Sequence, residues 1–215
     1  MNRFKKEKRG GICFYNCDNI EFMKTKPDNY YDLAIVDPPY GLDNKSHTYH
    51  SPGQSQKNSI SRFKPVKWDK TPPTPEYFRE LKRVSKNQII WGGNHFDLPP
   101  NRGFIIWDKM VYIPTMSQIE QAYVSEDRLP KLVKINNSDP NRIHVTQKPV
   151  KLYRWILHNY ATIGMNILDT HGGSFTNAVA CDMEGFELDI IEIDKKYFKD
   201  GLKAFDVYKS QTKLF

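Results

Sequence analysis

Short apolar runs that end in polar, proline or glycine turns recur along this chain, with amphipathic stretches between them. Runs with the length and bounding turns of strands lie at residues 11–15, 32–36, 88–91, 104–107, 121–124, 166–168 and 187–193. Apolar residues at helical spacing lie at 76–84, 150–160, 177–183 and 196–208. Strands that alternate with helices predict an α/β protein with a mostly parallel sheet, covered by helices on both faces.

Length, cysteine content and charge limit the class of protein. A chain of 215 residues is long enough for one α/β domain, and we expect a single domain over residues 1–215. Its cysteines, Cys13, Cys17 and Cys181, are too few for a disulfide framework and predict buried, reduced thiols. The net charge of +7 favours a polyanionic partner. Without a signal peptide or an apolar run of membrane-spanning length, we expect a cytoplasmic protein that does not enter a membrane.

The first candidate site is the tetrapeptide Asp37-Pro38-Pro39-Tyr40, directly after the strand at 32–36. Ligands bind at this end of the strands in open α/β sheets. The prolines stiffen the turn, so a carboxylate, the fixed Pro38 carbonyl and an aromatic ring are held close together. The two acceptors could hold the hydrogens of an amino group on a heteroaromatic base, while Tyr40 stacks on that base. A purely structural proline turn remains the alternative.

The second candidate site follows the strand at 166–168. There Asp169 precedes Gly172-Gly173-Ser174, and a helix comes next. Glycines allow close approach of the backbone to a ligand, and the start of a helix offers free N–H groups. The next strand ends at Glu192, where an acidic side chain typically accepts hydrogen bonds from ribose hydroxyls. This unit predicts a nucleoside site, with a structural strand–helix turn as the alternative.

Taken in order, these motifs resemble the beta group of DNA amino-methyltransferases, in which the catalytic half precedes the cofactor half. Two further segments are similar to this family. Residues 144–149, His-Val-Thr-Gln-Lys-Pro, are close to the family's His-Pro-Thr-Gln-Lys-Pro, and residues 18–23 are similar to the segment whose Asp contacts the cofactor adenine. The glycine loop departs from the family's Asp-Pro-Phe-x-Gly-Ser-Gly-Thr at Thr170, His171 and Phe175.

The resemblance implies a cofactor and a role for each matching residue. The cofactor is S-adenosylmethionine, and no metal is expected because methyl transfer from a sulfonium needs none. The catalytic residues implied are Asp37, Pro38, Pro39 and Tyr40. The residues implied to bind the cofactor are Asp169, Gly172, Gly173 and Ser174 at its methionine part, Glu192 at its ribose, Asp18 at its adenine, and Thr146 and Lys148 beside its carboxylate.

The resemblance also implies the fold and the activity. We expect the Rossmann-like methyltransferase fold, a seven-stranded sheet with six parallel strands and one antiparallel strand near an edge, in permuted motif order. The catalytic half spans about 11–124, a short target-recognition segment about 125–143, and the cofactor half about 144–215. The expected activity is methylation of N6 of an adenine flipped out of duplex DNA, by a chain that could form a homodimer.

Several alternatives stay open at this point. N4 of cytosine presents a similar amine, RNA could replace DNA, and the chain could be a non-catalytic nucleic-acid-binding subunit of a methylation complex. A restriction-modification enzyme, a phage self-protection enzyme and a solitary methylase are all compatible with the sequence. The segment 91–96, Trp-Gly-Gly-Asn-His-Phe, resembles a family segment that lines the base pocket, but a structural glycine turn explains it equally well.

Overall fold

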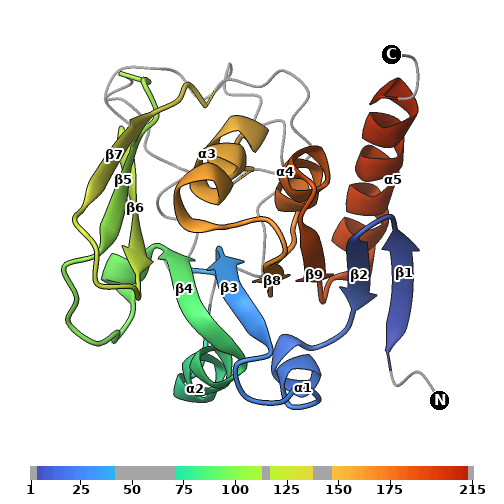
Figure 1. Ribbon diagram of the computed structural model, residues 1–215, viewed down its shortest axis with the longest axis horizontal. Helices are drawn as coiled ribbons and strands as arrows, with labels where there is room; N and C mark the ends of the chain where they lie inside the picture. The colour runs from blue at the N-terminus through green and yellow to red at the C-terminus, as the bar shows by residue number, and fades with distance from the viewer. Residues whose placement is uncertain (1–3, 42–70, 113–116, 138–146, 213–215) are drawn as a thin grey trace, which may run out of the picture.

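The computed structural model describes residues 4–41, 71–112, 117–137 and 147–212, which one mixed sheet organises (Figure 1). Within them the sheet has nine strands in the spatial order β1-β2-β9-β8-β3-β4-β6-β5-β7. The strands are β1 Lys5–Arg9, β2 Ile12–Asn16, β3 Tyr31–Val36, β4 Ser85–Trp91, β5 Phe104–Asp108, β6 Ile119–Val124, β7 Lys131–Lys134, β8 Asn166–Asp169 and β9 Glu187–Ile191. The helices are α1 Asn19–Met23, α2 Pro75–Val84, α3 Val150–Tyr160, α4 Thr176–Glu184 and α5 Lys195–Thr212, with a 3-10 turn, η3, at Gly93–His95.

Two of these strands run against the others. β1 is antiparallel to β2, and β6 is antiparallel to both β4 and β5, whereas the remaining neighbours are parallel. The predicted strand count of seven is therefore wrong, because β1 and β7 extend the sheet at its two edges. The seven strands between these edges contain one antiparallel strand, β6, as expected.

The two additional strands carry little sequence signal because each has a neighbour on one side only. β1, with the sequence KKEKR, buries none of its residues, and β7, with the sequence KLVK, buries only Val133. Neither strand shows the apolar alternation from which a strand is predicted. Charged side chains on such edges also hinder pairing with another sheet.

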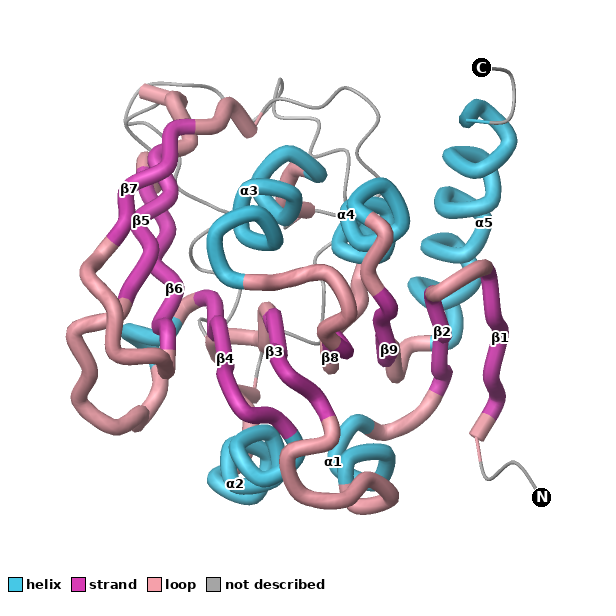
Figure 2. Tube along the Cα trace, viewed as in Figure 1, coloured by secondary structure: helices cyan, strands magenta, loops and turns pink. Residues whose placement is uncertain are grey.

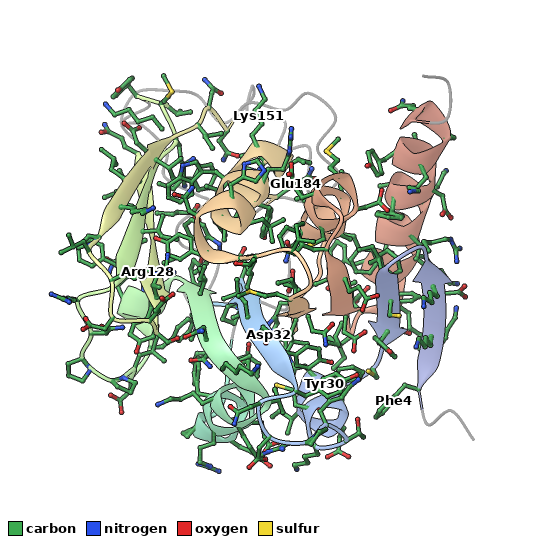
Figure 3. All side chains as sticks on the ribbon, in the orientation of Figure 1. Phe4, Tyr30, Asp32, Arg128, Lys151 and Glu184 are labelled. Atoms are coloured by element: carbon green, nitrogen blue, oxygen red, sulfur yellow. The ribbon has the colours of Figure 1, made fainter. Side chains whose placement is uncertain are left out.

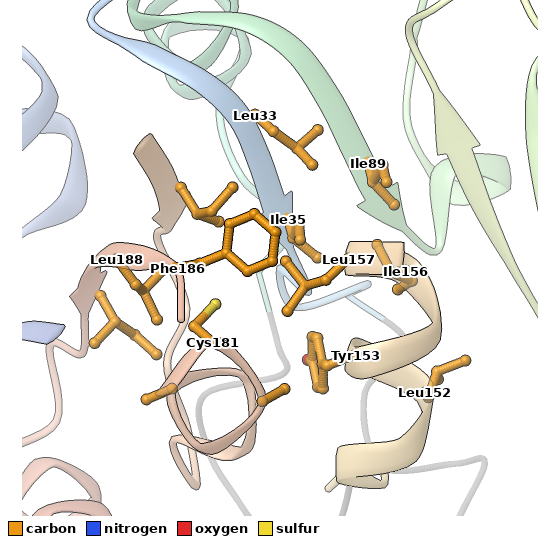
Figure 4. Packing of buried hydrophobic residues seen from close by; sticks show 14 of the residues in the cluster. Leu33, Ile35, Ile89, Leu152, Tyr153, Ile156, Leu157, Cys181, Phe186 and Leu188 are labelled. Carbon is orange, nitrogen blue, oxygen red and sulfur yellow. The ribbon is translucent and has the colours of Figure 1, made fainter. Parts of the chain in front are cut away.

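Helices cover both faces of the sheet (Figures 1 and 2). α3, α4 and α5 lie on one face, and α1 and α2 on the other. Residues of β2 alternate between the two cores: Ile12 and Phe14 join the cluster beneath α3–α5, whereas Cys13 and Tyr15 join the cluster beneath α1 and α2. Figure 4 shows the larger cluster, where residues of β3 and β4 pack with α3 and α4. The two-sided burial explains why the central strands read as continuous apolar runs.

Element boundaries follow local signals. The Thr74 side chain caps α2 by accepting a hydrogen bond from the Tyr77 N–H, and Pro75 opens that helix. Pro149 is the residue that precedes α3 as its N-cap, with extended backbone. β9 ends at Ile191, two residues before its predicted end at 193, so Glu192 lies in the following loop. β2 pairs with β9, so the strand at 12–16 lies beside the strand that precedes Glu192.

Two predictions from composition can be compared with the described residues. Cys13 and Cys181 are free and buried, whereas Cys17 is free but only half-buried. No helix in the described ranges combines the length and the apolar character needed to cross a membrane.

Candidate active site

Three neighbouring strands end at one edge of the sheet and bring the predicted motifs together. β9, β8 and β3 are adjacent and parallel, so Glu192, Asp169 and Asp37 lie at their carboxyl ends on the same edge. A cavity of about 220 Å³ opens there. This is the position at which open α/β sheets bind ligands.

The cavity is lined partly by residues predicted from sequence. The predicted residues in its wall are Asp37, Pro39, Lys148, Gly172, Gly173, Ser174 and Glu192. The wall also contains residues that were not predicted as site residues, namely Cys17, Asn19, Gln147, Tyr153, Thr170, His171, Thr176, Ile193, Asp194 and Tyr197. Most of these are sequence neighbours of a predicted residue. Tyr153 and Tyr197 come from α3 and α5, and no motif indicated them.

The glycine loop is tied to the end of β9. The Gly172 N–H donates to the Ile191 carbonyl at 2.7 Å, and the Gly173 N–H donates to Glu192 Oε2 at 2.9 Å. The Asp194 N–H donates to Glu192 Oε1 at 2.8 Å. Gly173 has φ +52°, a conformation that glycine adopts without strain. Each Glu192 oxygen keeps a further lone pair, so the carboxylate can also accept hydroxyl hydrogens of a ligand in the cavity.

Phe175, which stands where the family usually has glycine, turns its ring away from the cavity. Its backbone has φ 58°, and its side chain is fully buried. The ring centroid lies 4.9 Å from that of Phe14 and 5.8 Å from that of Phe198. Glycines make room for it, because a Cβ at Gly172 or Gly201 would lie 2.5 or 2.7 Å from the ring. The loop therefore keeps a glycine-like backbone while the additional ring packs in the core.

Asp169 and His171 organise the loop from within. The buried Asp169 carboxylate accepts hydrogen bonds from Asn177 Nδ2 and from the His171 N–H, each at 3.0 Å. Burial raises the pKa of Asp169 to about 7. Asn19 Nδ2 lies 3.1 Å from His171 Nε2, and His171 Nδ1 lies 3.0 Å from Thr170 Oγ1. Because the amide donates to Nε2, we assign the ring hydrogen to Nδ1; burial lowers the pKa of His171 to about 3, so the ring is neutral.

The tetrapeptide after β3 is held by contacts from other elements. Tyr40 OH donates to Asp37 Oδ1 at 2.8 Å, and the Tyr40 ring stacks on His95 with centroids 5.1 Å apart and an interplanar angle of 21°. A Cβ at Gly92 would lie 2.2 Å from the Tyr40 ring, so glycine is required beneath it. The segment at 91–96 thus forms a glycine turn that packs against the tetrapeptide, and its place in a base pocket stays a prediction.

Lys148 belongs to a network of buried charged side chains that extends from Asp37 to residues of the neighbouring strands. Its Nζ lies 2.5 Å from Asp37 Oδ2 and 3.2 Å from Glu120 Oε2, and Lys109 Nζ lies 2.7 Å from Glu120 Oε1. Burial raises the pKa of Asp37, although the Lys148 charge offsets part of that effect. Burial also acts to raise the pKa of Glu120, but the Lys148 and Lys109 charges outweigh it and lower the pKa. Glu120 was not among the predicted site residues, because one acidic residue in a weak strand is typical of a surface position.

Four predicted residues do not line the cavity. Asp18 is exposed, and its carboxylate caps α1 by accepting the Glu21 N–H at 2.9 Å. Pro38 and Tyr40 adjoin Asp37, and Asp169 shapes the loop behind the wall. A fifth, Thr146, lies outside the described residues. The ligand contacts implied for these residues stay predictions.

Comparison with known proteins gives the fold and the family. The chain resembles the structure of M1.HpyAVI in complex with SAM, with a TM-score of 0.58, 20% identity, and coverage of 90% of this chain and 99% of that chain. It resembles the cytosine-N4-specific PvuII DNA methyltransferase with a TM-score of 0.60, 14% identity, and coverage of 92% and 89%. YubD of Escherichia coli (strain K12), which its name describes as a candidate methylase, is 25% identical over 207 residues, 87% of each chain.

The sheet and its ligand edge define the chain as an α/β protein with the fold of S-adenosylmethionine-dependent methyltransferases. The family model N6_N4_Mtase, described as DNA methylase, matches residues 90–203, more than half of the chain. The chain therefore belongs to this family of DNA methylases. The match begins after the tetrapeptide at 37–40, so the assignment does not depend on that motif.

Proposed function

We propose that the chain transfers a methyl group from S-adenosylmethionine to the exocyclic amine of a base in duplex DNA, and that the base is adenine, modified at N6. The observation that carries this proposal is the shared cavity: Asp37 and the loop at Gly172 and Gly173 line one space although they are distant in sequence. A carboxylate that holds a base and a glycine loop that binds a nucleoside cofactor, placed in one cavity, would bring the amine of the base next to the cofactor.

The cavity wall has the chemistry that S-adenosylmethionine requires. Glu192 offers carboxylate oxygens to ribose hydroxyls, Gly173 leaves its surface open to close approach, and Tyr197 and Ile193 add apolar surface. When bound, the cofactor supplies an electrophilic methyl group on a sulfonium. Lys148 lines the cavity and donates to Asp37, so we assign it a role at the target amine; its expected place beside the cofactor carboxylate stays a prediction.

The tetrapeptide would act on the amine nitrogen. Asp37 and the Pro38 carbonyl accept its two hydrogens, which favours a pyramidal nitrogen whose lone pair points to the methyl carbon. The nitrogen–carbon bond forms as the carbon–sulfur bond breaks, and the surplus proton leaves the nitrogen. A raised pKa suits Asp37 to receiving that proton. Tyr40, stacked on His95, offers an aromatic surface to a base flipped from the duplex.

The target base is the finer part of the proposal. A tetrapeptide that begins with Asp is typical of adenine enzymes in the resembling family, which supports N6 of adenine over N4 of cytosine. A homodimer and a cytoplasmic location are further expectations from the family resemblance and from the sequence.

The test is methyl transfer to DNA followed by nucleoside analysis. The chain is incubated with methyl-labelled S-adenosylmethionine and unmethylated genomic DNA, and the digest is analysed by mass spectrometry. We expect label in N6-methyldeoxyadenosine, and a loss of at least about a hundredfold in Asp37→Ala because a base-holding acceptor is removed. Asp206→Ala, which removes an exposed α5 carboxylate paired with Arg9, is the matched control and should retain activity.

Each other outcome has a defined meaning. Label in N4-methyldeoxycytidine would keep the mechanism and replace the base. A parallel incubation with RNA covers the other nucleic acid: label in RNA with none in DNA would make RNA the substrate. Label that persists in Asp37→Ala would remove the tetrapeptide from the mechanism.

A further inference from the structure

Both oxygens of the Asp37 carboxylate are already hydrogen-bonded in the free chain. Tyr40 OH donates to Oδ1 and Lys148 Nζ donates to Oδ2. Each oxygen keeps one further lone pair, but the Lys148 charge lowers the basicity of Asp37. Under the proposed function, Asp37 therefore accepts a hydrogen of the target amine more strongly once Lys148 has moved away. The more buried donor, Lys148, points into the cavity wall and is 3% exposed, so it cannot move into water without breaking the core.

A second carboxylate lies within reach of the Lys148 ammonium. Glu120 Oε2 is 3.2 Å from Lys148 Nζ, which is ion-pair distance, but the two atoms are not aligned for a hydrogen bond. This buried oxygen has no hydrogen-bond partner among the residues that the structure describes. The other oxygen, Oε1, is held by Lys109 at 2.7 Å. The Glu120 carboxylate is therefore anchored at Lys109, while its second oxygen is ion-paired with Lys148 without a hydrogen bond.

We propose that Glu120 is a positioning residue that receives the Lys148 ammonium when the target amine replaces it on Asp37. The inference rests on the proposed function and assigns it a residue outside the recognised motifs. The exchange replaces one N–H donor on Asp37 by another, and Lys148 keeps its charge and a buried carboxylate partner throughout. No covalent bond changes in this step.

The surroundings of Lys148 favour an exchange between two carboxylates. The Trp91 ring lies 5.0 Å from Nζ and stabilises the cation on either carboxylate. Leaving a buried ammonium without a carboxylate is strongly unfavourable, so removing the Glu120 charge would bind Lys148 more firmly to Asp37. The titratable or charged groups that face this network are Asp37 and Tyr40 after β3, Lys109 after β5, Glu120 on β6, Tyr153 on α3 and Asp169 on β8.

The test compares Glu120→Gln with Glu126→Gln, a control that removes a half-exposed carboxylate just after the same strand, where it pairs with Arg128. Single-turnover methyl transfer is measured with saturating cofactor and DNA. In Glu120→Gln we expect the rate to fall roughly tenfold to a hundredfold, because Lys148 then stays on Asp37 and weakens it as an acceptor for the target amine. The cofactor Kd should change by less than about twofold, since Glu120 does not line the cavity.

The pH profile separates positioning from a merely structural role. The Glu120 charge raises the pKa of Asp37, so its removal should lower that pKa. The acid limb of the rate profile should therefore move to lower pH in Glu120→Gln and stay in place in Glu126→Gln. Titration of the ¹³C-labelled Asp37 carboxyl by NMR, assigned with Asp37→Asn, should show the same downward shift without any turnover.

A third variant covers a failure of Glu120→Gln to fold. Glu120→Asp keeps the charge at a greater distance from Lys148 and should have a rate between those of the unmodified chain and the Gln variant. The inference is overturned, and the proposed function is left intact, if Glu120→Gln matches the unmodified chain in its rate, in the acid limb of its pH profile and in the titration of Asp37. If the unmodified chain methylates no base while the control digest detects added standards, the proposed function fails and the inference fails with it.

Discussion

Phe175 shows how one residue can depart from a family pattern without closing the site. Its left-handed backbone, φ 58°, costs about 1–2 kcal/mol for a residue with a side chain. Its buried ring contributes about 3–5 kcal/mol. Burial of the ring outweighs the backbone strain, so the family's glycine at this position would fit the backbone and still weaken this chain.

We therefore expect Phe175→Gly to lower the free energy of unfolding by roughly 1–4 kcal/mol, which is the stabilisation by the ring less the cost of the backbone. Denaturant unfolding measures it. The control is Met110→Gly, at an exposed residue with φ 54°. Glycine relieves the backbone strain there without removing a core ring, so the free energy of unfolding should change by less than about 1 kcal/mol. Equal stability of Phe175→Gly and the unmodified chain would contradict this account of the packing.

Residue types and strand ends in the site were predictable, but side-chain pairing was not. Asp37, Gly173 and Glu192 could be found because each follows an apolar strand run. The pairing of Lys148 with Asp37 joins residues 111 positions apart, and the room for the Phe175 ring depends on Gly201 in α5. Such contacts depend on how elements pack, which periodicity along the chain does not encode.

At the scale of elements, the short helix α1 positions part of the cavity wall. Asp18 caps it, while Phe22 and Met23 anchor it in the core on the α1–α2 face. Asn19, at its first turn, contacts His171 in the glycine loop. The cap therefore supports the wall indirectly, whereas the family resemblance had implied a direct contact between Asp18 and the cofactor adenine.

Two substitutions separate these roles of Asp18. Asn is as good a cap as Asp, so Asp18→Asn should leave both stability and cofactor affinity nearly unchanged. Asp18→Ala removes the cap and should cost about 1 kcal/mol of unfolding free energy. Denaturant unfolding and isothermal titration with S-adenosylmethionine measure the two quantities. An equal loss of cofactor affinity in both variants would instead support the direct contact between Asp18 and the cofactor adenine that the family resemblance implies.

Long elements with apolar periodicity were predicted within a few residues, as α2 and α3 show, but short or polar ones were missed. α1 has five residues, too few to establish a helical period, and β1 is charged along its length. Figure 3 shows all described side chains on the ribbon, with Lys151 labelled at an exposed position of α3 and Glu184 at a half-buried position at the end of α4. Tertiary contacts stabilise such elements more than their own sequence does.

At the scale of the whole molecule, the cavity exists only when the sheet is assembled. Its wall combines the ends of β3, β8 and β9 with side chains from α3 and α5, which span most of the chain. An unfolded chain offers none of this arrangement. Any ligand of the cavity must therefore bind the folded state and stabilise the molecule as a unit.

This linkage separates a methyltransferase from the alternative of a nucleic-acid-binding subunit without a cofactor. At S-adenosylmethionine concentrations a hundredfold above Kd, the free energy of unfolding should rise by about 2.7 kcal/mol. For a domain of this size that corresponds to an increase in Tm of roughly 5–10 °C, measured by thermal unfolding at increasing cofactor concentration.

Glu192→Gln should reduce the increase, because one carboxylate oxygen that holds the loop and faces the cavity is lost. Glu187→Gln, an exposed position on the same strand β9, should leave it unchanged. A Tm independent of cofactor in the unmodified chain would mean that the altered glycine loop, with Thr170, His171 and Phe175, no longer binds S-adenosylmethionine. The family fold would then serve nucleic-acid binding alone.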